Sequence, residues 1–425
     1  MWKLTLLVAI VANLATSYGS EYMDRLTMTM SEAINSRFSC SNFVTDEYTE
    51  QCDEIHSGYD IDVLKKQYDQ ANSGLGGTCI YQLKRTHAEP QITSVSALIK
   101  LMSQICLNAQ GLTRTQCYNL LNFNNNEEMR YFVPKIDDVF PKSQDFISTV
   151  KTVIFARSDN DFSEHFKSCF GQLAKGETKV IDFGNLENVA NAINQWFNAS
   201  SLYYEEVVTA DDIDDDVVMM TGSHHHVEVA FKDFNFKEQV DHDFIISKDN
   251  IVSQKLWSGE GYGKVSYNEE LGATVLQIAL KGDRQAIILH PKVGGLEDML
   301  FKLRDSSVVL NLNAETEWEY INVVMPINEH NYGKENFVDG LKLANQISLM
   351  YLPGFDGFRG IFENQSGHLS HMFHTMYMKV NGLGASENPC ALENLEPKHT
   401  VNIDSAFAYY VVNSGSPEII GTWWY

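Results

Sequence analysis

The sequence predicts an α+β fold, with helices packed around mostly antiparallel β-sheets, and two observations indicate it. Helical periodicity dominates the first half of the chain, whereas alternating strand patterns dominate from Val217 onward. The 425 residues are 44% hydrophobic and 11% aromatic, which is enough to build a large core. Because no internal repeat or low-complexity linker interrupts these patterns, we expect one domain over residues 59–425.

The N-terminal residues have the layout of a secretory signal peptide. Lys3 precedes an apolar run from Leu4 to Leu14, and small residues follow the run. The run is shorter than the roughly 20 residues of a membrane-spanning helix, so a membrane anchor is the weaker interpretation. We therefore predict a signal peptide over residues 1–19, a polar extension over residues 20–58, and secretion to the extracellular space.

In the first half of the chain, the spacing of apolar residues predicts helices and strands in the following order. Residues 59–74 indicate a helix that stops near Gly74. Residues 94–123 indicate two helices that are separated by a turn at Gly111. Beyond them we expect buried strands over residues 151–158 and 179–183, and helices over residues 162–174 and 186–200.

In the second half, hydrophobic residues alternate with a period of two, as in strands that bury one face. The expected strands cover residues 217–223, 226–234, 264–270, 274–280, 285–291 and 320–326. Gly259, Gly261 and Gly263 resemble a phosphate-binding loop, but the third glycine falls one residue early for that pattern. We interpret this glycine-rich stretch as a turn.

Three consecutive histidines, His224–His226, lie where one expected strand ends and the next begins. His224 and His226 would share one face of a strand and could hold zinc or copper with a third ligand. A solvated strand end is the more common meaning of such a run, so we predict no metal site. The sequence has no G-x-S-x-G or H-E-x-x-H motif, and we expect neither an enzyme nor a cofactor.

The formal net charge of -24 limits the partners of the protein. Such a surface repels nucleic acid and heparin-like polyanions unless a basic patch exists, and the sequence shows no such patch. We therefore expect no nucleic-acid partner and regard heparin as a poor candidate.

Covalent modifications are also suggested by the sequence. Seven cysteines fit an oxidising compartment, and their odd number leaves at least one thiol free or paired between chains. Cys40 and Cys52 share one polar segment and form the candidate disulfide. The sequons at Asn198 and Asn364 are candidate glycosylation sites if they are exposed.

Several segments, in their order along the chain, resemble the serpin family. NSGSPEIIGTWWY at residues 413–425 resembles the closing strand of serpins, and NIDSAFAYYVV at residues 402–412 resembles the buried strand before it. HTMYMKVNGLG, which begins at His374, resembles the serpin segment H-K-A-x-x-x-V-N-E-E-G. The likeness covers Asp60–Tyr425 and implies the serpin fold, with an exposed reactive-centre loop near the C-terminus.

Other segments depart from the family pattern. Thr221–Val229 keeps almost nothing of the serpin motif N-x-x-x-F-K-G-x-W, and a serine motif before the first core helix is reduced around Ser94 and Ser96. Gly382 and Leu383 replace two acidic residues that are usual before the loop. Because both reduced motifs support the region where the central sheet of serpins opens, we expect this sheet not to open in the usual way.

The resemblance implies a trap in which a protease cleaves the loop and the loop then inserts as a new central strand. Gly384 and Ala385 lie at the hinge, where Ala385 would point to the core face. Alternation places Glu387 and Pro389 on that face as well. Burying an unpartnered carboxylate costs several kcal/mol, and proline has no N–H to donate to a neighbouring strand.

We therefore predict a non-inhibitory serpin that acts through binding, as a carrier, storage or interaction protein. Its partner would be an extracellular protein or a small ligand, without insertion into a membrane. The alternative is a working serine-protease inhibitor. Counting from Gly384 by the spacing usual in the family places its bait bond between Lys398 and His399, which would attract a trypsin-like serine protease.

Overall fold

A computed structural model describes most of the chain. The described residues are 58–86, 91–109, 111–136, 143, 145–158, 161–171, 175–200, 206–214, 217–312, 316–338, 358, 361–362, 367–384 and 396–423. A separate unit, Met1–Gln51, lies outside these residues. The predicted signal peptide and the candidate disulfide between Cys40 and Cys52 therefore lie outside the described residues.

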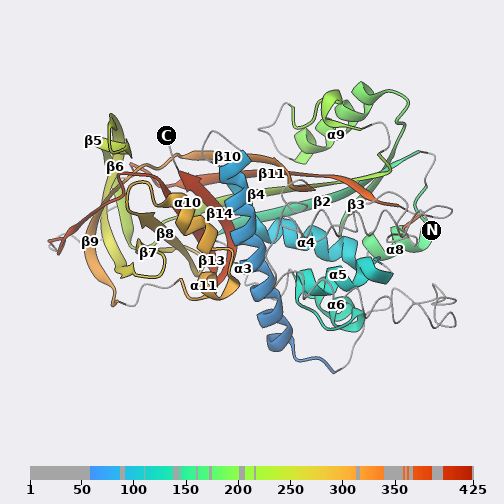
Figure 1. The fold of residues 1–425 in the computed structure, drawn as a ribbon, viewed down its shortest axis with the longest axis horizontal. Coiled ribbons are helices and arrows are strands. Elements are labelled where there is room, and N and C mark those ends of the chain that lie inside the picture. Colours follow the sequence, from blue (N-terminus) through green and yellow to red (C-terminus); the bar gives the residue numbers. More distant parts are fainter. Residues whose placement is uncertain are drawn as a thin grey trace, which may run out of the picture. The chain divides into compact units, whose positions relative to one another are not determined.

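The described helices lie mostly in the first half of the chain, as predicted (Figure 1). They are α3 (Ile61–Thr86), α4 (Val95–Cys106), α5 (Gly111–Leu121), α6 (Asn126–Phe132), α8 (Glu164–Cys169), α9 (Leu186–Ser200), α10 (Leu296–Lys302) and α11 (Ser306–Leu310), with short 3-10 helices at Val133–Lys135 and Ala210–Asp212. Ser94 caps α4 because its side chain accepts a hydrogen bond from the backbone N–H of Ala97. The predicted helix over residues 186–200 agrees with α9 at both ends.

The described strands form a five-stranded and a nine-stranded sheet. The first has the order β10 (His330–Asn336), β11 (Leu369–Asn381), β4 (Met219–Ala230), β2 (Ile147–Arg157) and β3 (Glu177–Ile181). The second follows β1 (Ile92–Ser94), β14 (Ser416–Trp423), β13 (Phe407–Asn413), β8 (Arg284–Pro291), β7 (Ala273–Leu280), β6 (Asn250–Asn268), β9 (Glu319–Met325) and β12 (Thr400–Asn402), with β5 (Phe234–Ser247) paired to β6. The predicted α+β class is confirmed, although β4–β11, β2–β3 and β9–β12 pair in parallel.

The five-stranded sheet is covered on both faces, because successive side chains of a strand point to opposite sides. On one face, Val153 and Phe155 of β2 pack against Ile193 and Phe197 of α9, which lies over this part of the sheet in Figure 1. On the other face, Ile154 of β2 belongs to a cluster with residues of α3, α4 and α5. The strands that meet in the centre of this sheet are therefore buried from both sides.

Helix α3 is longer than predicted, because it continues through a glycine-rich stretch to Thr86. A Cβ atom at Gly77 would lie 1.7 Å from the carbonyl oxygen of Leu303, so only glycine allows this close approach. The expected stop near Gly74 was wrong because tertiary packing outweighs the weak helix propensity of glycine. Figure 1 shows α3 beside β14.

The glycine-rich stretch that was expected to form a turn lies inside strand β6. A Cβ atom at Gly259 would lie 2.7 Å from the carbonyl oxygen of Asn235 on β5, and one at Gly261 would lie 2.5 Å from the Cα atom of Phe234 on the same strand. Gly263 similarly faces the side chain of Ile321 on β9. The glycines therefore let β6 pair closely with its neighbours, and the prediction of a turn was wrong.

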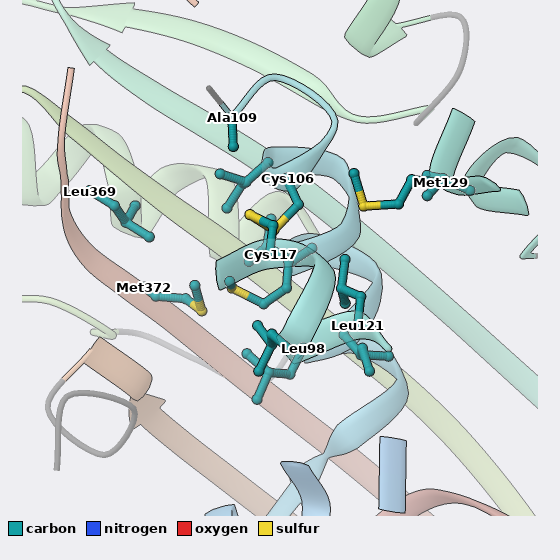
Figure 2. Packing of buried hydrophobic residues seen from close by; sticks show 14 of the residues in the cluster. Leu98, Cys106, Ala109, Cys117, Leu121, Met129, Leu369 and Met372 are labelled. Atoms are coloured by element: carbon teal, nitrogen blue, oxygen red, sulfur yellow. A yellow bond between two sulfur atoms is a disulfide. The ribbon is translucent and has the colours of Figure 1, made fainter. Parts of the chain in front are cut away.

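A disulfide that the sequence analysis did not predict joins α4 to α5. Cys106 and Cys117 are both buried, with Cα atoms 5.5 Å apart, which is ordinary for a disulfide. Figure 2 shows this bond inside the apolar cluster that also contains Leu98, Leu121 and Met372. The disulfide ties together the two helices that support one face of the five-stranded sheet.

Candidate functional site

The candidate site is the line where β4 and β11 meet in the centre of the five-stranded sheet. The strands run parallel, and their uninterrupted register extends from Met220 opposite His371 to Ala230 opposite Asn381. They are direct neighbours in the sheet order, so the sheet is closed along this line. We call these two strands, with the side chains that link them, the seam.

Three buried histidines, His224, His225 and His374, occupy the middle of the seam. His225 of β4 and His374 of β11 lie on the face that packs against α4, whereas His224 lies on the opposite face together with His226. His224 and His225 are each only 1% exposed. The prediction of a solvated strand end was therefore wrong for these two residues, because β4 runs on as one long strand between β2 and β11.

His374 joins β11 to β4 and to the start of α4. Its Nε2 accepts a hydrogen bond from the backbone N–H of Ser94 at 3.2 Å, and its Nδ1 lies 2.8 Å from the Oγ of Ser223. Because Nε2 is an acceptor, the proton of the neutral ring lies on Nδ1 and is donated to Ser223. This one ring holds three segments together and requires a single tautomer.

His225 connects β4 to two further elements. Its Nδ1 lies 2.6 Å from the Oγ of Ser94, and its Nε2 lies 2.8 Å from the Oγ of Ser148 on β2. The same Ser94 hydroxyl caps α4 by accepting the N–H of Ala97. His225 and His374 therefore meet at Ser94, which couples the seam to the N-terminus of α4.

Two further contacts cross the seam on its other face. The Nδ1 of His224 lies 2.9 Å from the Oγ1 of Thr375. Closer to the loop, Asn381 donates a hydrogen bond to the carboxylate of Glu228 at 3.0 Å. The Nε2 of His226 lies 3.4 Å from that carboxylate. Side chains thus bridge β4 and β11 at several points between Ser223 and Asn381 in addition to the backbone ladder.

Burial keeps the histidines of the seam uncharged. Loss of solvent lowers the pKa of His224 to about 4 and that of His374 to about 3, and nearby histidines add to both effects. The pKa of His225 is likewise lowered well below its usual value, first by burial and then by His374. All three rings are therefore neutral at physiological pH.

The end of β11 leads into the C-terminal loop and is anchored at that point. Leu383 packs against apolar clusters that include Phe236 and Val380. The N–H of Gly384 donates a hydrogen bond of 2.8 Å to the carbonyl of Phe236. Gly382 and Gly384 have φ angles of 85° and 71°, a region that favours glycine. The residues before the loop are therefore held against β5.

The chain after the loop is tied to β9. The N–H of Lys398 donates to the carbonyl of Tyr320 at 3.0 Å, and the carbonyl of His399 accepts from the N–H of Asn322 at 3.1 Å. The Nζ of Lys398 also lies 2.7 Å from the carboxylate of Glu319. The structure therefore places the candidate bait bond at the start of the short parallel pairing of β12 with β9.

The remaining candidate residues do not lie at the seam or fall outside the described residues. Asn198 is exposed on α9. The hinge residues Ala385, Glu387 and Pro389 and the sequon at Asn364 lie outside the described residues.

No group of three or more histidine, cysteine, aspartate or glutamate side chains in the described part of the chain is arranged to hold a metal ion. None of the helices described is long and apolar enough to cross a membrane.

Sequence reasoning missed the hydroxyl partners of the histidines, which are Ser94, Ser148, Ser223 and Thr375. One signal could have identified part of this network. The alternation of a continuous strand through His224–His226 would have placed the middle histidine on the core face. The contact between α4 and the seam depends on tertiary structure that no local pattern encodes.

Three comparisons with known proteins place this geometry in context. The family model described as Serpin (serine protease inhibitor) matches residues 70–422. No curated protein sequence matches the chain significantly. Many solved structures do match, and three of them illustrate the range.

Serpin48 of the insect Tenebrio molitor is 16% identical, with a TM-score of 0.73 over 86% of this chain and 99% of that one. Human thyroxine-binding globulin, solved with thyroxine bound, is 17% identical, with a TM-score of 0.71 over 84% of this chain and 98% of that one. The mouse protein-Z dependent protease inhibitor is 15% identical, with a TM-score of 0.71 over 85% and 98%. At these identities the similarity establishes the fold.

Proposed function

The chain belongs to the serpin family, and we propose that this member does not trap proteases and acts instead by binding a partner outside the cell. The observation that carries the proposal is the pair Glu387 and Pro389 in the loop hinge. Both residues fall at positions that would enter the core face of the five-stranded sheet if the loop inserted between β4 and β11.

The side chains that already line this face make such an insertion unfavourable. Val227, Val229, Met376 and Met378 are 0 to 5% exposed and form an apolar surface beside the seam. An inserted Glu387 would have to bury its carboxylate there or take up a proton. An inserted Pro389 could not donate a hydrogen bond to a flanking strand.

The closed seam and the anchored hinge support the same proposal. Insertion requires β4 and β11 to separate, which would break the links made by His224 and His374 across the seam. It also requires the bond from Gly384 to Phe236 to break and Leu383 to leave its apolar contacts. Each of these contacts raises the free energy of the inserted state relative to the closed one.

The rival proposal, an inhibitor with its bait bond between Lys398 and His399, is less well supported. A protease must bind several residues around the cleaved bond in an extended, accessible form. The backbone at Lys398 and His399 is already hydrogen-bonded to β9, and the Lys398 side chain contacts Glu319. A trypsin-like enzyme would have to break this pairing before it could cut.

The class of partner is proposed from the surface and from the structural neighbours. The strongly negative net charge disfavours nucleic acid and heparin, so we propose an extracellular protein or a small ligand. Thyroxine-binding globulin, solved with thyroxine bound, is a precedent within the same fold for a small ligand. Secretion, with glycosylation at Asn198 and Asn364, is part of this proposal.

The experiment is incubation of the purified protein with near-equal amounts of trypsin, chymotrypsin or a glutamate-specific protease, followed by denaturing gels. We expect chymotrypsin and the glutamate-specific protease to cleave in the loop, trypsin to cleave slowly at Lys398, and no enzyme to form a complex that survives denaturation. A covalent complex with any of these enzymes would overturn the proposal. The control is the double variant Glu387→Ala, Pro389→Ala, which removes both obstacles and leaves the rest of the loop unchanged.

A further inference from the structure

The histidines of the seam are buried participants in the contacts that keep it closed. His224, His225 and His374 are at most 1% exposed. Each places a ring nitrogen within hydrogen-bond distance of a side chain or backbone group on another element. A change in the charge of His224 or His374 therefore acts directly on the pairing of β4 with β11, and a change at His225 acts on the contacts of β4 with Ser94 and Ser148.

At His374 the geometry accommodates only the neutral ring. Nε2 accepts the backbone N–H of Ser94, and Nδ1 donates to Ser223. A second proton on the ring would have to sit on Nε2, where it would face the N–H of Ser94. Protonation would thus replace a hydrogen bond at the start of α4 by two opposed donors.

The basic groups around the histidines add to this effect. On β2, Lys151 is the register partner of His224, and on α4, Lys100 lies within electrostatic reach of His225. On β10, Lys334 is the register partner of Thr375, next to His374. All three groups are cationic, so each of them disfavours a positive charge on the histidine rings nearby.

At acidic pH, the acidic and other titratable groups nearby would not neutralise a positive charge on the histidines. Glu335 of β10 is the register partner of His374, but burial raises its pKa to about 8, so it is uncharged at acidic pH. Cys79 of α3 lies near Glu335, and burial raises its pKa as well. The charged carboxylate of Glu228 is engaged by Asn381 and lies beside His226, towards the loop.

We propose that this arrangement makes closure of the seam pH-dependent: the seam is closed at neutral pH and opens as the pH falls, because the histidines take up protons when β4 and β11 separate. This inference concerns the sheet itself. It holds whether or not the loop can insert.

The direction of this pH dependence follows from the number of protons that the histidines bind in the closed and in the open seam. A histidine that titrates at 6.5 when exposed, and at about 4 or 3 in the closed seam, binds a proton only in the open state between these values. Each such histidine favours opening by about tenfold per pH unit below its exposed pKa. Glu335 acts in the opposite direction, because it is protonated when closed and would ionise above 4.5 when exposed. Three histidines outweigh one carboxyl group, so opening increases as pH falls.

The test is hydrogen exchange followed by mass spectrometry at about pH 7.5 and about pH 5, on either side of the usual histidine pKa. After correction for the pH dependence of chemical exchange, amides of β4 and β11 should lose at least about tenfold protection at the lower pH. Amides of β7, which belongs to the other sheet and contains no histidine, should keep theirs. Unchanged protection of the seam, or an equal loss in both sheets, would overturn the inference.

Two variants assign the effect to the seam. The first is the double variant His224→Asn, His225→Asn. Each asparagine keeps a polar atom near the Nδ1 position but takes up no proton, so the loss of protection in β4 and β11 at the lower pH should be smaller by at least about tenfold. The control is His290→Gln on β8, where burial also lowers the pKa of the histidine and where Nε2 contacts Ser405. If the double variant responds to pH as fully as the unmodified protein, the proposal is wrong. The measurement on the unmodified protein stands alone should the double variant fail to fold.

Discussion

At the residue scale, Leu383 is the side chain that fixes where the loop leaves the sheet. The resemblance led us to expect an acidic residue at this position, and its replacement by leucine is visible in the sequence. What the leucine does was not predictable, because its contacts come from β5 and β11, which are far apart in the sequence. An apolar residue just before the loop is informative only once the positions of those strands are known.

We expect Leu383→Glu to loosen this end of the loop. The substitution removes apolar contacts of a half-buried side chain and puts a charge against Phe236, at a cost of about 1–2 kcal/mol in that anchor. Cleavage between residues 385 and 395 by a low concentration of chymotrypsin, measured as a rate, should increase several-fold. Val293→Glu, in the turn that follows β8, introduces the same charge at an exposed position and is the control. Equal cleavage rates in all three proteins would show that Leu383 does not hold the loop.

At the residue scale, the burial of the histidine run was also not predicted. The run His224–His226 was visible in the sequence, but its environment was misjudged, because polar residues in a row usually lie at the surface. Serine and threonine hydroxyls from other elements satisfy these rings, which is the condition for burying them. Only the tertiary structure brings those hydroxyls together.

At the element scale, the helices and strands were predicted best where one residue pattern runs without interruption. Helix α9 was predicted with both of its ends, because its amphipathic pattern is regular and starts and stops cleanly. Helix α3 and strand β6 were misjudged, because glycine was taken as a sign of a turn. In both elements the glycines instead allow another backbone to approach closely.

Two glycine substitutions in α3 should therefore have opposite effects. Gly77→Ala places a methyl group 1.7 Å from the carbonyl oxygen of Leu303 and should destabilise the protein by about 1–3 kcal/mol. Gly74→Ala meets only Ser306 Cβ at 3.6 Å, and should be neutral or stabilising by about 0.5–1 kcal/mol. Urea unfolding of both variants measures the difference. If both substitutions stabilise the protein equally, the close contact between α3 and Leu303 does not exist in solution.

At the scale of the whole molecule, the order of motifs along the chain was sufficient to recognise the family. The family model over residues 70–422 and the solved serpin structures confirm that recognition and the α+β class. The closed seam could not be predicted in the same way. It joins segments that lie roughly 150 positions apart, such as Ser223 and His374, through contacts that no local pattern encodes.

The central claim is that the loop does not enter the sheet, and one measurement tests it most directly. The protein is cleaved once between residues 385 and 399, the cut is located by mass spectrometry, and thermal unfolding is compared for intact and cleaved forms. An inserted strand would add hydrogen bonds to both β4 and β11, so insertion would raise the melting temperature by tens of degrees. Our account predicts a change smaller than about 5 °C, because Glu387 and Pro389 exclude the loop from the core face. A large rise would contradict it and would identify the protein as a serpin whose loop inserts.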